Sequence, residues 1–120
     1  MQNQKSALGL DVNITVLIGY IIGIVALVLI FIEKDNKFVR FHAFQSAFYW
    51  AAVFVIYIAL IFVMAFLAFL SSMLASLFSL LVFLFGLAVL GVVIFLAIKS
   101  YQGEMIKLPV IGEMAQDWSK

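Results

Sequence analysis

Residues 41–98 read FHAFQSAFYWAAVFVIYIALIFVMAFLAFLSSMLASLFSLLVFLFGLAVLGVVIFLAI, and this run of 58 residues contains no Asp, Glu, Lys or Arg. One continuous helix of that length would extend about 87 Å, nearly three times the hydrocarbon core of a bilayer. The segment must therefore fold back on itself. Ser71 and Ser72 interrupt the apolar residues near the middle of the run, so we expect the chain to reverse within residues 68–75. The run predicts two transmembrane helices, at about residues 38–69 and 73–99.

A third apolar segment precedes this run. Residues 14–32 are 19 residues without a charge, which as a helix would extend about 28 Å and again match the hydrocarbon thickness. A cleavable signal peptide is the alternative interpretation, but its apolar core is usually roughly 7–15 residues long, and no small-x-small cleavage site precedes Glu33. The sequence therefore predicts an all-α fold: one integral membrane domain over residues 1–120, a bundle of three transmembrane helices of which the first is residues 13–32.

The composition of the 120-residue chain agrees with a membrane location. Hydrophobic residues make up 68% and charged residues 11%, against roughly 45–50% and 25% in soluble domains. In water a chain this short must cover most of its surface with polar groups, so lipid is the solvent that fits. A net charge of +1 gives no field to attract nucleic acid, and the absence of cysteine excludes disulfide, thiolate and iron–sulfur chemistry.

No predicted helix carries an Asp, Glu, Lys or Arg at mid-depth. A charge at the bilayer centre costs roughly 2.5–3.5 kcal/mol, and such charges mark proton relays and other functional sites within the membrane. The sequence also has no phosphate loop, nucleophile elbow or paired zinc-ligand motif. We therefore interpret the chain as a non-enzymatic protein without a cofactor or a metal.

The chain beyond the third helix is expected to form an interfacial tail over residues 103–119. Gly103 is a typical helix stop, and the apolar residues that follow it are too short a run to cross a bilayer. Met114, Ala115 and Trp118 then share one side of a short amphipathic helix. This pattern predicts a segment that lies on the membrane surface. A frayed tail is the alternative.

Three crossings would place the loop after the first helix and the C-terminal tail on the same side of the membrane. Six of the seven Lys and Arg residues fall on that side, and Lys5 alone falls on the other. Because cytoplasmic loops carry an excess of Lys and Arg, we expect a plasma-membrane protein with its N-terminus outside and its C-terminus in the cytoplasm. Asn13-Ile14-Thr15 matches the N-glycosylation pattern, which we interpret as a coincidence because it abuts the first helix.

A polar stripe marks the first turns of the second predicted helix. Its members have the spacing i, i+3, i+4 and i+7, which puts them on one helix face. They are His42, Gln45, Ser46 and Tyr49. His42, the only histidine, has three interpretations: a local hydrogen bond within the stripe, a contact with a partner, or metal ligation with help from nearby carboxylates.

Arg40 stands at the expected membrane boundary, where three roles are open to it. It can mark topology by snorkelling, clamp a lipid phosphate, or pair with a carboxylate of the tail such as Glu104.

Glycines on two of the predicted helices favour close helix packing. Gly19 and Gly23 stand four residues apart on the first helix, and Gly86 and Gly91 offer similar small surfaces on the third. The contact can form within the chain or with a second copy.

Two separated motifs carry a family resemblance. KFVRFHAFQS at residues 37–46, and YQGE at 101–104 followed by LPVIGE at 108–113, resemble the signatures of a widespread family of small prokaryotic membrane proteins. That family is similar to Tic-twenty, a component of the chloroplast inner-envelope import channel, and includes MamF-type magnetosome membrane proteins. The resemblance covers residues 14–115, nearly the whole chain, and implies the fold and the membrane location. It also suggests that the two motifs pack together on the cytoplasmic side.

We therefore expect a scaffold or accessory subunit that acts through protein or lipid contacts at the cytoplasmic face. Its partners would be the bilayer and other membrane proteins or a second copy, and no nucleic acid. A component of a protein-translocation or transport assembly, similar to the Tic-twenty family, is the alternative. The candidate interaction or structural residues are the polar stripe, Arg40 and, from the second motif, Gln102, Gly103, Glu104 and Pro109.

Overall fold

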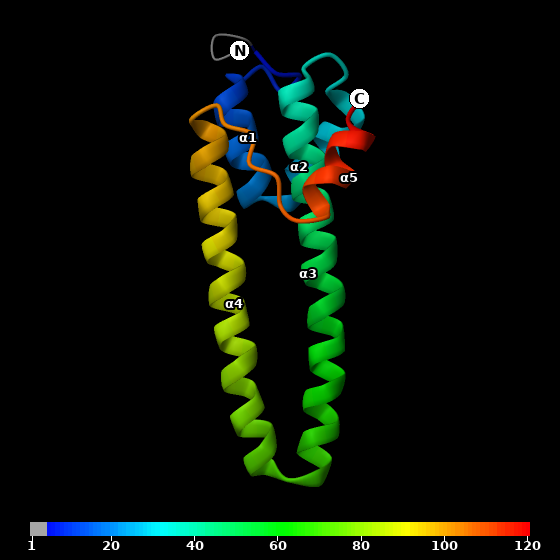
Figure 1. Cartoon of the computed structure of the whole chain (residues 1–120), viewed down its shortest axis with the longest axis vertical. Coiled ribbons are helices and arrows are strands. Elements are labelled where there is room, and N and C mark those ends of the chain that lie inside the picture. Colours follow the sequence, from blue (N-terminus) through cyan, green and yellow to red (C-terminus); the bar gives the residue numbers. More distant parts are fainter. Residues whose placement is uncertain (1–4) are drawn as a thin grey trace. The chain divides into compact units, whose positions relative to one another are not determined.

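The computed structural model describes residues 5–120, which form five α-helices and one isolated β-bridge between Lys5 and Asp11 (Figure 1). In chain order the helices are α1 (Val12–Ile21), α2 (Gly23–Ile32), α3 (Lys37–Leu70), α4 (Ser72–Tyr101) and α5 (Ile111–Trp118). The described residues fall into two compact units. The larger unit comprises residues 5–50 and 93–120, and the smaller unit comprises residues 51–92. The fold is all-α, as the sequence predicts.

The smaller unit is built from the second part of α3 and the first part of α4. The chain reverses at Ser71, inside the predicted stretch 68–75, and the two helical segments run antiparallel (Figure 1). Gly86 lies against Tyr57: a Cβ added to this glycine would lie 2.8 Å from the tyrosine hydroxyl oxygen, so a larger residue would force the two apart. Gly91, by contrast, has open space where a Cβ would be.

α3 and α4 are the two helices long and apolar enough to cross a membrane. Their most apolar stretches have mean hydropathies of 3.0 and 3.1. The core helix of a soluble protein can have such a composition, but only 6% of that stretch in α3 and 22% in α4 is buried inside the protein. Their apolar side chains therefore fit a lipid environment. The observed bounds differ by no more than two residues from the expected 38–69 and 73–99.

The predicted first crossing is wrong, because residues 13–32 do not form one helix. Ile22 interrupts the segment in an extended conformation (φ −115°, ψ 97°), and α1 and α2 have only ten residues each. A helix of that length extends about 15 Å, half the thickness of the hydrocarbon core. Figure 1 shows α2 running back toward the end at which α1 begins. The two helices thus form a short hairpin.

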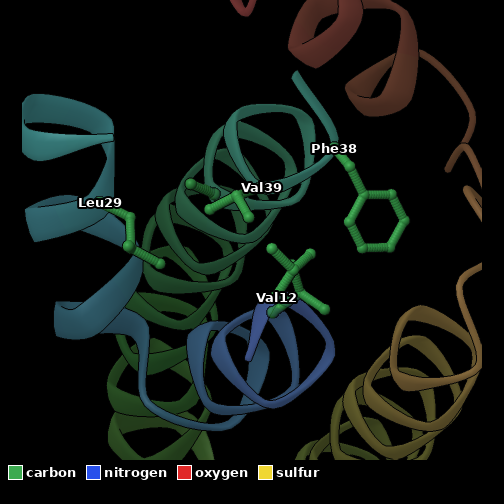
Figure 2. Packing of buried hydrophobic residues seen from close by; sticks show 6 residues of the cluster. Val12, Leu29, Phe38 and Val39 are labelled. Atoms are coloured by element: carbon green, nitrogen blue, oxygen red, sulfur yellow. The ribbon is translucent and has the colours of Figure 1, made fainter. Parts of the chain in front are cut away.

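The core of the larger unit packs this hairpin against the start of α3. Its buried apolar side chains come from all three helices (Figure 2): Val12, Val16, Leu29, Phe38, Val39 and Ala43.

The first glycine pair is split by the break and contacts two different helices. A Cβ added to Gly19 would lie 3.7 Å from Leu29 Cδ1 on α2. One added to Gly23 would lie 3.0 Å from Trp50 Cδ1 on α3, which is tighter than ordinary contact. The absence of a side chain at these two positions therefore lets helices of the same chain approach one another.

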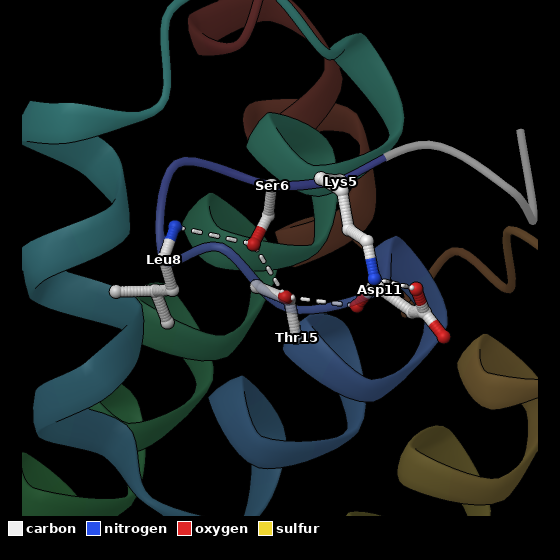
Figure 3. A network of polar contacts seen from close by, with 5 residues as sticks. All are labelled: Lys5, Ser6, Leu8, Asp11 and Thr15. Carbon is white, nitrogen blue, oxygen red and sulfur yellow. Dashed lines mark hydrogen bonds and ion pairs between the residues drawn. The ribbon is translucent and has the colours of Figure 1, made fainter.

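A tight loop precedes α1 (Figure 3). Lys5 Nζ lies 2.8 Å from Asp11 Oδ1 across the loop. The hydroxyl oxygens of Ser6 and Thr15 lie 2.6 Å apart, and the Leu8 amide donates to Ser6 Oγ at 3.3 Å. Local polar contacts thus hold the described part of the N-terminal segment against the first turn of α1.

The same loop lies beside the connection between α2 and α3. The Ala7 amide donates to Oε1 of the buried Glu33 at 2.8 Å, and Asn13 Nδ2 donates to the Tyr101 carbonyl at the end of α4. The described N-terminal loop and the connection after residue 32 therefore lie side by side, because a hairpin stands where one crossing was expected.

Candidate functional site

The polar stripe of α3 is buried in the larger unit. Among its members His42, Gln45 and Ser46 are almost completely inaccessible, and Tyr49 is also buried. A docking surface needs accessible side chains, so of the two roles expected for these residues, interaction or structural, their burial favours the structural one. Side chains of the stripe bind other segments of the same chain.

Gln45 holds the segment that follows α4. Its Nε2 donates to the Ile106 carbonyl at 2.8 Å, and its Oε1 accepts from the Leu108 amide at 2.9 Å. The carboxamide therefore pairs with two backbone groups as a neighbouring strand would. Nε2 also donates to the Tyr20 hydroxyl at 2.7 Å. We call Tyr20, His42, Gln45 and these two backbone groups the Gln45 clasp.

The Gln45 clasp reaches His42 through Tyr20. Tyr20 Oη accepts from Gln45 and lies 2.6 Å from His42 Nδ1, so it donates its own hydrogen to Nδ1. This network assigns the hydrogen of the neutral imidazole to Nε2. A tyrosine hydroxyl is protonated at neutral pH, so it is able to donate this hydrogen bond to Nδ1.

Aromatic rings enclose His42. The rings of Phe38, Phe41 and Tyr20 stand edge-on to the imidazole, with centroid distances of 4.5, 5.1 and 5.3 Å. Nε2 is buried. Within residues 5–120 no group of three or more His, Cys, Asp or Glu side chains is placed to hold a metal ion. The hydrogen bond that His42 makes is to Tyr20 on α1, 22 residues away in the chain, and not within the polar stripe as one of the three interpretations expected.

Ser46 and Trp50 bind the broken end of α1. Because the helix stops at Ile22, the Gly19 and Tyr20 carbonyls need other donors, and an unbonded carbonyl in an apolar medium is costly. Ser46 Oγ donates to the Gly19 carbonyl at 2.7 Å, and Trp50 Nε1 donates to the Tyr20 carbonyl at 3.0 Å. Side chains of α3 thus complete the hydrogen bonding of the hairpin.

Arg40 links the ends of two helices. Its Nη1 donates to the Glu33 carbonyl at 2.8 Å, and its Nε donates to the Ser119 carbonyl at 3.1 Å. These carbonyls cap α2 and α5, where the helix dipole favours a cation. The pair with Glu104 that the sequence suggested is not formed, because Glu104 lies 3.6 Å from Lys99 Nζ instead.

Arg40→Ala is expected to loosen α5 by about 1.5–3 kcal/mol, because it removes one hydrogen bond to the Ser119 carbonyl and a charged donor contributes roughly that much per hydrogen bond. Amide hydrogen exchange over residues 111–119 in detergent measures the effect as faster exchange. Arg40→Lys should restore only part of it, since an ammonium lacks the divergent donors of a guanidinium. Lys34→Ala removes an exposed cation and is the matched control. Unchanged exchange in Arg40→Ala would contradict the link.

Gly103 ends α4 in a Schellman motif. It has a φ of 89°, and its amide donates to the Ser100 carbonyl at 3.0 Å. The Glu104 amide donates to the Lys99 carbonyl, also at 3.0 Å, which completes the motif. Gln102, one residue earlier, is exposed. The helix stop that the sequence predicts at Gly103 is confirmed.

A second turn leads into α5. Val110 has φ 64° and ψ −54°, and the Ile111 amide donates to the Pro109 carbonyl at 2.6 Å, which is a γ-turn. A positive φ is strained for a β-branched residue. Gly112 approaches Lys107 so closely that an added Cβ would lie 2.6 Å from the lysine Cβ. The strained turn and the close approach together return the chain toward α3.

α5 packs on α3 by one face and exposes the other. Ala115 is fully buried against Phe41 and Phe44. The Trp118 ring lies 5.7 Å from the Phe48 ring and is nevertheless 63% exposed. The amphipathic helix expected in the tail is therefore present, and the two sequence motifs contact each other where the Leu108 amide donates to Gln45 Oε1.

Tyr20 and Trp50 are contact residues that the sequence analysis missed. Tyr20 is the only Tyr or Trp in residues 14–32, and Trp50 extends the polar stripe by one further i+4 step from Ser46. An aromatic ring with a polar atom needs a hydrogen-bond partner when it is buried. This requirement is the sequence feature from which a contact of Tyr20 and of Trp50 could have been predicted.

Together these features define a small α-helical membrane protein whose larger unit is held by side-chain hydrogen bonds to its own backbone. The chain belongs to the MamF/MmsF family, described as the magnetosome magnetite crystal formation protein family, whose model matches residues 3–115.

Two archaeal relatives cover almost the same length. A UPF0132 membrane protein of Methanocaldococcus jannaschii is 36% identical over 117 residues, which are 97% of this chain and 96% of that protein. A UPF0132 membrane protein of Archaeoglobus fulgidus is 30% identical over 110 residues, 87% of this chain and 91% of the relative. No solved structure matches the chain. The expectation of a small prokaryotic membrane-protein family is confirmed.

Proposed function

We propose that this protein is a non-enzymatic scaffold or accessory subunit of the cytoplasmic membrane. The observation that carries the proposal is that several polar side chains of α3 donate hydrogen bonds to the backbone of the larger unit itself. Arg40, Gln45 and Ser46 all donate to carbonyl groups of other segments. Such bonds fix the shape of a surface, which is what a protein that acts through contacts requires.

The proposed membrane arrangement has two crossings, α3 and α4, with the α1–α2 hairpin entering one leaflet. Each helix of the hairpin is long enough for one leaflet only. The outer face of α2 is apolar and open, with Ile24 72% and Phe31 73% exposed. Such a face suits lipid better than water. The extended residue at the tip is tolerated because α3 bonds the carbonyl groups beside it.

This arrangement places both termini in the cytoplasm. The connection on the opposite side is the turn at Ser71, which carries no charge, so all seven Lys and Arg residues fall on one side. That side is cytoplasmic by the positive-inside rule. The proposal keeps the expected cytoplasmic C-terminus and replaces the expected outside N-terminus.

We assign the exposed side of the tail to a protein partner, either another membrane protein or a second copy. Its large apolar side chains outside the segment that precedes Leu108 are 40–69% exposed, and they are Val110, Met114 and Trp118. Met and Trp are enriched in the cores of protein interfaces.

Photocrosslinking in native membranes tests the scaffold proposal. A photoreactive amino acid in place of Met114 is expected to give a discrete crosslinked band, because a specific partner presents the same atoms in every complex. The matched control replaces Phe62, an exposed residue of α3 in the smaller unit, and is expected to crosslink only to lipid. Lipid adducts alone at Met114 would contradict the proposal.

A translocation component similar to the Tic-twenty family is the alternative. The broken α1–α2 hairpin favours it, because interrupted helices build substrate and ion sites in many transporters. Purified protein in liposomes distinguishes the two. Ion or solute flux from this chain alone supports translocation, whereas tight liposomes together with a discrete crosslink support the scaffold.

We do not extend magnetite formation, which the family's description names, to this chain. Iron sites that template a mineral need carboxylates free to coordinate the metal. Within residues 5–120 no group of three or more His, Cys, Asp or Glu side chains is placed to hold a metal ion.

A further inference from the structure

A pocket of about 310 Å³ opens where three segments of the larger unit meet: the start of α3, the segment after α4 and the end of α5. Ligand pockets range from roughly 300 to 1,000 Å³, so this one suits a small chemical group. Its lining residues are Lys37, Phe41, Met105, Gln116, Ser119 and Lys120. We call it the basic pocket.

Cations surround the basic pocket. Lys37 and Lys120 line it directly, and Lys107 Nζ donates to Oε1 of the lining residue Gln116 at 2.5 Å. Among the described residues that line it, none is acidic. Asp117 lies 3.7 Å from Lys120 Nζ, but both side chains are about three-quarters exposed, and an ion pair in that position contributes little. The basic pocket therefore favours an anion.

The remaining lining of the basic pocket is partly apolar. Phe41 and Met105 contribute apolar surface, the first from α3 and the second from the segment after α4. Lys37 is the first residue of α3, whose 34 residues extend about 51 Å and exceed the roughly 30 Å of the hydrocarbon core. In the proposed crossing its first turns, and with them the basic pocket, therefore lie at the level of the lipid headgroups. Cationic and apolar groups at that depth match the junction between the phosphate and the acyl chains of a lipid.

We propose that the basic pocket binds the phosphate-bearing headgroup of an anionic phospholipid. The ammonium groups of Lys37 and Lys120 pair with the phosphate oxygens, and the Gln116 carboxamide, whose oxygen already accepts from a lysine, offers its NH₂ group. Phe41 and Met105 contact the glycerol and the first methylene groups. A zwitterionic lipid brings its own cation toward the lysines and binds less tightly. This inference does not depend on the scaffold role.

Native mass spectrometry of the full chain, purified in a non-ionic detergent, tests the inference. Phosphatidylglycerol and phosphatidylcholine with the same acyl chains are titrated separately. We expect the first phosphatidylglycerol to bind about tenfold more tightly, because each lysine close to an anionic lipid adds to the attraction. Equal affinity for the two lipids would overturn the proposal.

A pair of double variants separates a specific site from overall charge. Lys37→Gln/Lys120→Gln is expected to abolish the preference and to leave phosphatidylcholine binding unchanged. Lys5→Gln/Lys34→Gln changes the net charge equally, but these lysines line a different pocket, so the preference should remain. Equal loss in both double variants would overturn the proposal, because it would show attraction by net charge alone.

Two further measurements complete the test. Gln116→Glu adds a negative charge without removing a lysine, and it is expected to weaken phosphatidylglycerol binding while circular dichroism shows unchanged helix content. Millimolar inorganic phosphate is expected not to displace the lipid, because it lacks groups for Phe41 and Met105. Displacement by phosphate would identify a free phosphoanion as the occupant and would overturn the lipid assignment.

Discussion

Gln45→Leu is expected to release residues 105–110 from α3 and to lower the free energy of unfolding of the larger unit by about 2–6 kcal/mol. Gln45 is completely buried and makes three hydrogen bonds. Leucine fills a similar volume but leaves the Ile106 carbonyl and the Leu108 amide without partners. Each buried group left unbonded costs about 1–3 kcal/mol. The segment should therefore detach rather than stay docked on an apolar side chain.

Trypsin provides the measurement, because the bond after Lys107 lies inside the released segment. Every 1.4 kcal/mol of opening free energy changes the open population about tenfold, so cleavage at Lys107 should accelerate at least tenfold in Gln45→Leu. Gln102→Leu is the matched control, since Gln102 is exposed at the end of α4. Cleavage at the wild-type rate in Gln45→Leu would show that other contacts hold the segment.

Structural features that depend only on residues close together in the sequence were predictable. The run from Phe41 to Ile98 has no charge, and lipid is the solvent in which such a run can form exposed helices. The reversal near Ser71 follows from the polar residues at that point of the run. The helix stop at Gly103 follows from the ability of glycine to adopt a positive φ.

The α1–α2 hairpin was not predictable in this way. Residues 14–32 contain no proline and no charge, and their two glycines are common in membrane helices. The break at Ile22 is supported by Ser46 and Trp50, which bond to carbonyls 27 and 30 residues earlier in the chain. No local pattern reports such a distant contact.

The candidate site was predictable in part. The spacing of the polar stripe put His42, Gln45 and Ser46 on one helix face, and the family resemblance suggested that the two motifs meet. Burial of the stripe was not foreseen. Its main partners are backbone groups, such as the carbonyl of Ile106, which every residue carries and which leave no trace in the sequence.

The double variant Ser46→Ala/Trp50→Phe is expected to move the N-terminal segment across the membrane in a large fraction of molecules. In the hairpin this variant leaves the Gly19 and Tyr20 carbonyls unbonded. In a continuous helix the same carbonyls would accept from amides four residues further on. At about 1–3 kcal/mol for each unbonded carbonyl, the variant favours the continuous helix by about 2–6 kcal/mol relative to the wild type.

Labelling with a membrane-impermeant maleimide measures this shift, because the chain has no cysteine of its own. In an otherwise wild-type chain, Lys5→Cys and Lys120→Cys should both be protected from reagent added outside intact cells. In the double variant Lys5→Cys should become labelled while Lys120→Cys stays protected. Ser79→Ala/Trp118→Phe removes the same chemical groups from exposed positions and should change nothing. Outside labelling of Lys5→Cys in the wild-type background would mean that residues 13–32 cross the bilayer after all.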